Sequence, residues 1–222
     1  MPDSTLAAST DGRVSLTSTS SWAGAEGSAT TAGNGHSYTS TNSTIGVYAR
    51  TITSGGRGGG TTYYCTRSFF AFDCSGESGT VDSATLKLYL DNYGTNGPPS
   101  AVVVVGADAL DGDVNDHGNI FSSGTTRHNA YSSSSIVTTT AQYISFSLNF
   151  DGITALNSAI GSGTFTCALV SDIFDHLGTT PSSTYARTQV YYTEDTSGSK
   201  DPLLEIDYAA IVRNSILFGT NF

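Results

Sequence analysis

The sequence predicts an all-β protein: an antiparallel β-sandwich of the jelly-roll kind, with one short helix and extended terminal arms. The 222 residues are rich in Ser, Thr and Gly, and β-formers such as Thr, Tyr, Val and Phe outweigh Lys, Glu and Met. Apolar and polar residues alternate with period two in six or more segments. Gly, Ser, Asn and Asp are concentrated between these segments, as in the loops of a sandwich.

Eight segments are predicted to be strands. In chain order they are 45–52, Arg67–Asp73, Val81–Asp91, Ala101–Ala107, Gln142–Phe150, Thr164–Val170, Tyr185–Thr193 and Leu203–Tyr208. The third has the clearest half-buried pattern, with Ala84, Leu86, Leu88 and Leu90 on one face. Ala101–Ala107 is apolar on both faces and is expected to be central, and the alternation in Gln142–Phe150 predicts that Phe150 points inward.

One helix is predicted, over Asp151–Ile160. Asp151 is a suitable N-cap residue, and Gly161 is placed to end the helix. Apolar residues at helical spacing form a stripe of Ile153, Leu156 and Ile160.

Composition divides the chain into three parts. Residues 1–44 are of low complexity, contain Trp22, and are expected to form an extended N-terminal arm, because they carry too little apolar surface for a core of their own. Residues 45–208 form the sandwich domain. Residues 209–222 form an apolar tail that docks on its own domain or on a neighbouring subunit. Both ends are therefore expected to mediate assembly into a homo-oligomer or a larger lattice.

The charge balance excludes some partners. Charged residues make up 13% of the chain, and 9 cationic against 19 acidic residues give a net charge of −10. This balance repels a phosphate backbone, so no nucleic-acid partner is expected. No apolar run approaches the roughly 18 residues of a membrane span. The N-terminus shows neither the basic nor the apolar region of a secretory signal, which predicts synthesis in a cytoplasm.

The three cysteines make neither a disulfide framework nor a CxxC metal pair. Cys167 lies in an alternating strand pattern and is expected to be a small buried side chain. A bridge between Cys65 and Cys74 is an open alternative to free thiols.

Four segments carry a resemblance to a known family. Arg67-Ser-Phe-Phe-Ala-Phe-Asp73, a Gly/Ser turn and the strand Ser83-Ala-Thr-Leu-Lys-Leu-Tyr-Leu90 resemble the DNRLRE-type β-sandwich family, which is related to carbohydrate-binding modules. The segments Ser183–Thr193 and Asp201–Tyr208 resemble its closing strand pair. The resemblance covers roughly residues 45–208, although Asp108–His117 replaces the Trp-containing middle segment of many members.

The resemblance implies three alternative functions. The first is a non-catalytic virion structural protein, such as a capsid decoration, head-fibre or tail component of a tailed phage, which reaches the outside by lysis and needs no export signal. Its partners would be other virion proteins or copies of itself. The second is a polysaccharide-binding module of a cell-surface or glycan-degrading system. The third is a glycan-active enzyme, and no nucleophile motif or distinctive carboxylate pair favours it.

One segment concentrates the oxygen ligands that Ca²⁺ prefers. These are Asp108, Asp111, Asp113, Asn115 and Asp116. The start imitates an EF-hand loop, but Asp116 stands where the loop needs Gly and Ser122 where it needs Glu, so a true EF-hand is excluded. A looser Ca²⁺ site and a solvated acidic loop remain as the alternatives.

The remaining candidate residues are scattered. The four histidines (His36, His117, His128 and His176) lie in separate segments without metal-site spacing, and Asp172, Asp175 and His176 form a small polar cluster. Arg67 and Arg187 lie in strand patterns, where they either pair with an Asp or stack on a Tyr, or contact a sugar carboxylate. Six tyrosines either provide an aromatic platform for sugar rings or pack across strands: Tyr63, Tyr64, Tyr89, Tyr93, Tyr185 and Tyr191.

Overall fold

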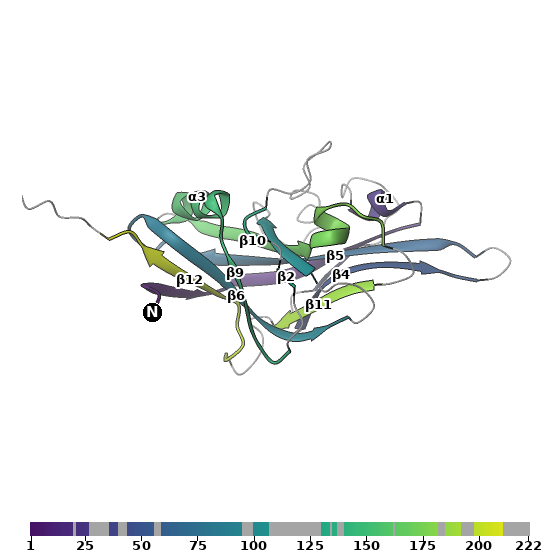
Figure 1. Cartoon of the computed structure of the whole chain (residues 1–222), viewed down its shortest axis with the longest axis horizontal. Coiled ribbons are helices and arrows are strands. Elements are labelled where there is room, and N and C mark those ends of the chain that lie inside the picture. Colours follow the sequence, from purple (N-terminus) through teal and green to yellow (C-terminus); the bar gives the residue numbers. More distant parts are fainter. Residues whose placement is uncertain are drawn as a thin grey trace, which may run out of the picture.

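The computed structural model confirms the predicted fold class: two antiparallel sheets pack against each other and few helices accompany them (Figure 1). It describes residues 1–19, 21–26, 36–39, 44–55, 59–94, 100–106, 130–133, 135–136, 140–161, 163–181, 185–191 and 198–210.

The strands, with their bounds, are β1 (Ser4–Ala7), β2 (Thr10–Ser18), β3 (His36–Thr39), β4 (Thr44–Thr53), β5 (Thr61–Asp73), β6 (Val81–Tyr93), β7 (Ser100–Val105), β8 (Ser135–Ile136), β9 (Gln142–Ser147), β10 (Thr164–Ser171), β11 (Tyr185–Tyr191) and β12 (Leu203–Tyr208). The helical elements are α1 (Trp22–Glu26), α3 (Phe150–Ala159) and the π-helix η1 (Asp172–His176).

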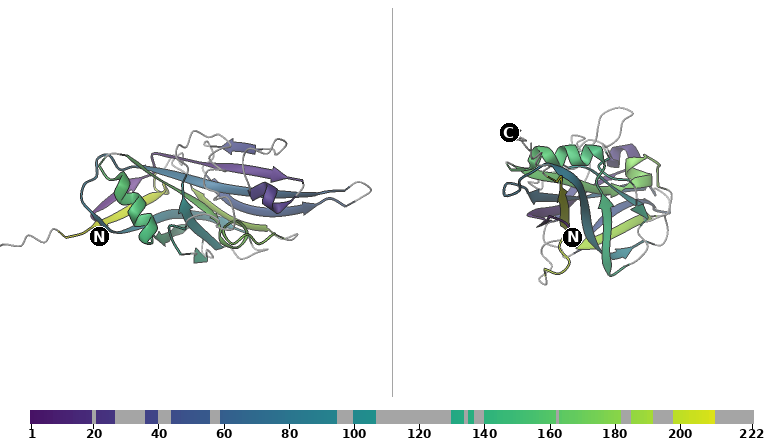
Figure 2. Two further views of the ribbon diagram at one scale, coloured as in Figure 1. Left: turned by 90° about the horizontal axis from the view of Figure 1, so that it is seen from above. Right: turned by 60° about the vertical axis from the view of Figure 1, so that its left-hand side comes forward.

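Hydrogen-bonded neighbours follow one continuous order, β1-β12-β6-β11-β4-β5-β10-β7-β8, with β2 added to β5, β3 to β2 and β9 to β6. The two layers arise because the long strands exchange partners along their length. One edge of β5 pairs with β4 up to Thr66 and with β10 from Ser68 onward, while β2 follows the other edge. In the same way β6 pairs first with β12 and then with β11 along one edge. Two further views show the elongated outline that these strands produce (Figure 2).

The main core lies between the two layers. Phe70 and Phe72 of β5 are buried in one cluster with Leu86, Leu88 and Leu90 of β6. The polar-facing positions of β6 remain partly exposed, so the predicted alternation of this strand is confirmed. Burying a Leu or Phe side chain contributes about 1.5–3 kcal/mol, and this cluster therefore supplies much of the driving force for folding.

β7 is buried on both faces, as predicted, but it does not occupy the centre of a sheet. Val103 faces the main core, whereas Val102 and Val104 face a second cluster with Phe69 of β5. In the strand order β7 is followed only by β8, a strand of two residues. The continuous apolar run therefore reflects cover on both faces rather than a central position.

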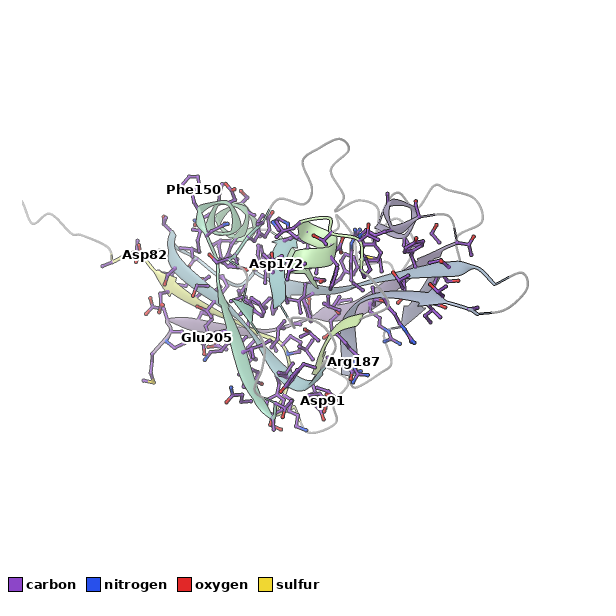
Figure 3. The ribbon with its side chains drawn as sticks, turned by 45° about the vertical axis from the view of Figure 1, so that its right-hand side comes forward. Asp82, Asp91, Phe150, Asp172, Arg187 and Glu205 are labelled. Atoms are coloured by element: carbon purple, nitrogen blue, oxygen red, sulfur yellow. The ribbon has the colours of Figure 1, made fainter. Side chains whose placement is uncertain are left out.

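The predicted helix is present, with two corrections at its start. α3 begins at Phe150, and its N-cap is Asn149, whose side chain accepts a hydrogen bond from the Gly152 amide at 3.0 Å. Phe150 is 82% exposed rather than inward-facing (Figure 3), because β9 ends at Ser147 and the strand alternation stops before it. Gly161 follows with φ +78°, the conformation expected of a glycine that ends a helix.

The N-terminal segment is extended, as expected, but its described part belongs to the sandwich. β1 pairs with β12 from Ser4 to Ala7, and β2 pairs with β5 from Thr10 to Ser18. These strands form although they carry few apolar residues, because their partner strands supply most of the core. The domain therefore begins within residues 1–44, and residues 211–222 of the predicted tail lie outside the described part.

Two short helical elements were not predicted. Trp22 in α1 is 3% exposed, and its indole Nε1 donates a hydrogen bond of 3.1 Å to the carbonyl of Phe174 in η1. Both residues pack with Ala49 and Cys65 over β4 and β5. Each element has five residues, too few for a helical period to be visible in the sequence.

Candidate functional site

Three tyrosines come together on the outer side of β6, β9 and β11, and we call them, with Lys200, the tyrosine surface. Tyr89 and Tyr143 are paired directly across β6 and β9, so their side chains leave the sheet on the same face. Their ring centroids are 5.3 Å apart at an interplanar angle of 87°, and those of Tyr89 and Tyr191 are 5.7 Å apart at 78°. These edge-to-face contacts are each worth about 0.5–1.5 kcal/mol beyond area burial.

Lys200 adds a positive charge to this surface. Its Nζ lies 4.1 Å from the centroid of the Tyr191 ring and 5.4 Å from that of Tyr89. At such distances the ammonium group is attracted to the negative ring face. Lys200 thus places a hydrogen-bond donor beside partly exposed aromatic rings.

The hydroxyl groups hold the rings in place. The Tyr143 hydroxyl lies 3.2 Å from the Ser199 carbonyl oxygen and 3.1 Å from that of Asp201, which ties the segment around Lys200 to β9. The Tyr89 hydroxyl donates to the Ala141 carbonyl at 2.8 Å. Burial raises the pKa of Tyr143 above its ordinary value, and the nearby Asp201 carboxylate adds to the shift. The ring is therefore neutral throughout the physiological range.

Tyr191 brings a carboxylate to the edge of the surface. Its hydroxyl donates to Asp91 Oδ1 at 3.2 Å. The tyrosine surface therefore combines three ring edges and faces, an ammonium donor and a carboxylate acceptor, all on partly exposed residues. Aromatic side chains beside a small number of placed polar groups are a common feature of ligand sites.

The tyrosines predicted from the sequence divide into separate groups. Tyr89 and Tyr191 lie together in the tyrosine surface, whereas Tyr93 packs against the main core and Tyr63 against the cluster around Trp22. Tyr64 follows Tyr63 on β5, outside the tyrosine surface. The side chain of Tyr185 is outside the described part. Tyr143 is not among the six tyrosines predicted to form an aromatic platform. Nothing in the sequence distinguished Lys200.

Arg67 has the structural role that was one of its two predicted alternatives. Its Nε and Nη2 donate hydrogen bonds of 2.7 Å each to the two carboxylate oxygens of Asp175, and the side chains are 0% and 1% exposed. Arg67 lies at the point where β5 exchanges β4 for β10. A side chain buried in this way does not reach a sugar in solution. The cluster of Asp172, Asp175 and His176 is thus the η1 element that covers Arg67.

The other arginine singled out from the sequence, Arg187, is half-buried on β11 (Figure 3). It is opposite Tyr48 of β4 in the sheet register.

The predicted calcium ligands Asp108, Asp111, Asp113, Asn115 and Asp116 all lie outside the described residues, as do His117 and His128. Among the residues that the structure does describe, no three or more His, Cys, Asp or Glu side chains gather in a way that could hold a metal ion.

All three cysteines are buried and none forms a disulfide, so the structure has no Cys65–Cys74 bridge. Cys65 packs near Trp22, whereas Cys74 and Cys167 belong to the main core. Burial raises the pKa of the Cys74 and Cys167 thiols, which keeps both protonated and unreactive.

A scan against protein-family models found no match to this chain, and a search of the curated proteins found no similar sequence. The resemblance to DNRLRE-type sandwiches therefore rests on the quoted motifs alone. Within the described part, every helix is too short or too polar to cross a membrane.

Proposed function

We propose that this protein is a non-catalytic binding protein whose sandwich recognises a carbohydrate through the tyrosine surface. The observation that carries the proposal is the joint placement of Tyr89, Tyr143 and Tyr191 around Lys200 on one sheet face. Sugar rings have apolar C–H faces that pack on aromatic side chains and hydroxyl groups that accept from an ammonium donor. Rings held by hydroxyl contacts to the backbone lose little conformational entropy on binding, which favours recognition.

We propose further that the sandwich acts as a structural component of a virion, either a capsid decoration or part of a head fibre or tail. Support comes from the acidic composition, rich in Ser, Thr and Gly, and from the position of the first and last described strands. β1 and β12 are paired, with the Asp3 amide donating to the Ile206 carbonyl at 2.9 Å. Attachment to a particle through the paired strands β1 and β12 would leave the tyrosine surface accessible. The alternative is a polysaccharide-binding module without a particle.

The test of carbohydrate binding is a glycan array followed by affinity electrophoresis in gels that contain individual polysaccharides. We expect retardation of the wild type by at least one polysaccharide and a loss of affinity of about tenfold or more for Tyr191→Ala, which corresponds to ~1.4 kcal/mol. Tyr64→Ala is the matched control, since it removes a tyrosine outside the tyrosine surface.

The outcomes separate the alternatives. If no polysaccharide is bound, or if Tyr64→Ala and Tyr191→Ala have the same affinity, the three tyrosines serve only to pack across strands and the proposal is wrong. Immunogold labelling of particles distinguishes a virion component from a free module, and release of reducing ends from a bound polysaccharide would instead indicate an enzyme.

A further inference from the structure

The tyrosine surface continues into a polar sheet face on the strands β12, β6 and β9, which are neighbours in this order. The inward positions of these strands carry apolar residues of the main core, among them Leu86 of β6, Phe146 of β9 and Leu204 of β12. The outward positions carry short polar side chains and a few charged ones. We call this outward side of the three strands the outer face.

The pairing register aligns the outer face in rows that cross the strands. Thr85 of β6 is opposite Glu205 of β12 on one edge and opposite Ser147 of β9 on the other. Residues opposite each other in an antiparallel pair project from the same side of the sheet. Ser147 is exposed, and the other two side chains are partly exposed. This row therefore presents two hydroxyl groups and a carboxylate at the surface.

The next row contains a partly exposed ion pair. Lys87 of β6 lies between Leu203 of β12 and the exposed Ser145 of β9. The Lys87 Nζ is 2.6 Å from Glu205 Oε1 of the first row, and the two side chains are 31% and 24% exposed. An ammonium group has three N–H donors, and the bond to Glu205 uses one of them. The pair therefore offers a donor and an acceptor side by side.

These rows lead directly into the tyrosine surface. Tyr89 follows Lys87 by two residues on β6 and is opposite Tyr143 of β9. Buried and partly exposed residues alternate on β6 between Thr85 and Tyr89, so the ion pair and the rings share one side of the sheet. At about 3.3 Å per residue, the distance along the strand from Thr85 to Tyr89 is ~13 Å. The outer face thus adds a polar strip to the aromatic rings.

The charges of this region favour a neutral ligand. Figure 3 shows Glu205 between Asp82 at one end of β6 and Asp91 toward the other. The Lys87 charge is matched by Glu205, and Asp91 adds a carboxylate beside the tyrosine surface. The net charge of −10 repels an acidic polymer at long range.

We propose that the outer face extends the tyrosine surface and that its ligand is an internal stretch of a neutral polysaccharide, which lies along β6. The inference rests on the proposed carbohydrate binding and names its substrate class. Sugar rings pack on Tyr89 and Tyr143, and hydroxyl groups of the following units accept from Lys87 and donate to Glu205. Because the contacts are spread along the strand, affinity increases with chain length and does not depend on a chain end.

A series of oligosaccharides tests this inference. Isothermal titration calorimetry of the full chain uses disaccharides, tetrasaccharides and octasaccharides from dextran, mixed-linkage β-glucan, β-mannan and β-galactan, with the reducing end either intact or chemically reduced. We expect that in at least one series the affinity rises about tenfold or more from disaccharide to octasaccharide, and that reduction of the chain end leaves it unchanged. Alginate oligosaccharides of the same lengths should bind more weakly.

The double variant Lys87→Gln with Glu205→Gln separates the outer face from the tyrosine surface. It removes both charges together, and an ion pair at the surface contributes little to stability, so the variant should fold, as circular dichroism can verify. We expect about tenfold weaker binding of the octasaccharide and unchanged binding of the disaccharide. Asp172→Asn is the matched control, since it neutralises a partly exposed carboxylate in η1, away from the outer face, and should bind both like the wild type.

The possible failures are distinguishable. Equal affinity for disaccharide and octasaccharide, or an octasaccharide affinity that the double variant retains, would overturn the inference while leaving the tyrosine surface as a binding site. Tighter binding of alginate than of every neutral series, or no binding in any neutral series, would overturn the assignment to neutral polysaccharides. Absence of binding to every polysaccharide on the glycan array would refute the proposed function, and this inference with it.

Discussion

At the scale of single residues, the ion pair between Arg67 and Asp175 joins β5 to η1. Two hydrogen bonds of 2.7 Å join fully buried partners at the point where β5 changes neighbours. A buried pair adds little net stability over an apolar pair of similar size, but it is costly to break. We therefore expect the pair to act mainly by holding η1 over the strand exchange.

We predict that Asp175→Asn lowers the free energy of unfolding by about 3–5 kcal/mol, because it removes the carboxylate that pairs with the buried Arg67 guanidinium. Asp172→Asn in the same helical turn, where the carboxylate is half-exposed, should cost less than about 1 kcal/mol. Urea denaturation followed by circular dichroism measures both values. Equal losses for the two variants would show that the ion pair is not the cause.

A second residue-scale prediction concerns alkaline pH. Burial and the hydrogen bond to Glu77 raise the pKa of Tyr208, and burial also raises the pKa of Tyr131 and Tyr143. For groups with a raised pKa, the stabilisation is complete below the unfolded value of about 10 and is lost as the pH rises through the folded value.

We therefore expect the free energy of unfolding to fall as the pH rises above about 10. In a titration that follows tyrosine ionisation by absorbance, the Tyr208→Phe variant should show one tyrosine fewer among those that ionise above the ordinary pKa. Stability that is constant to pH 12, with all tyrosines ionising near their ordinary value, would contradict this.

At the scale of elements, the α1–η1 contact and the strands β1 and β2 show how the N-terminal segment is built into the domain. β2 pairs with β5 along nine residues, from Tyr63 to Ala71, and Trp22 is buried under η1. Deletion of residues 1–19 should therefore unfold the sandwich rather than release an arm, because β5 would lose its neighbour along one edge.

The measurement is the thermal unfolding of the deleted chain beside that of the wild type, with the emission of the single Trp22 as a probe of burial. We expect loss of the cooperative transition and a red-shifted emission. An unchanged melting temperature would mean that β1 and β2 contribute nothing to the fold. Deletion of residues 209–222 in parallel tests the predicted role of the tail in assembly.

The elements that the sequence predicted are those with strong alternation or clear caps. β6 and β12 match closely, because each buries one face and exposes the other. β1 and β2 were missed as parts of the domain, because polar strands supply little signal when the partner strand provides the core. The buried Arg67 was placed in a strand, but its partner Asp175 is 108 residues away, and no local pattern reports such a distance.

At the scale of the whole molecule, a chain with few charges distributes them unevenly around one sandwich. Aromatic rings and Lys200 gather on the outer side of β6, β9 and β11, and the carboxylates of Asp3 and Glu77 lie beside Tyr208 of β12. The outward-facing tyrosines were predictable from strand alternation, whereas their meeting was not, since it depends on which strands pair.

Isothermal titration calorimetry tests carbohydrate binding directly. The ligand is the polysaccharide that retards the protein most, and the proteins are the wild type and the variants Tyr89→Ala, Tyr191→Ala and Tyr64→Ala. We expect saturable binding by the wild type and the Tyr64→Ala control, and a loss of affinity of about tenfold or more in the other two variants. The length of the polysaccharide should be unchanged after incubation. Binding of equal strength in all four proteins, or shortening of the polysaccharide, would contradict a non-catalytic tyrosine surface.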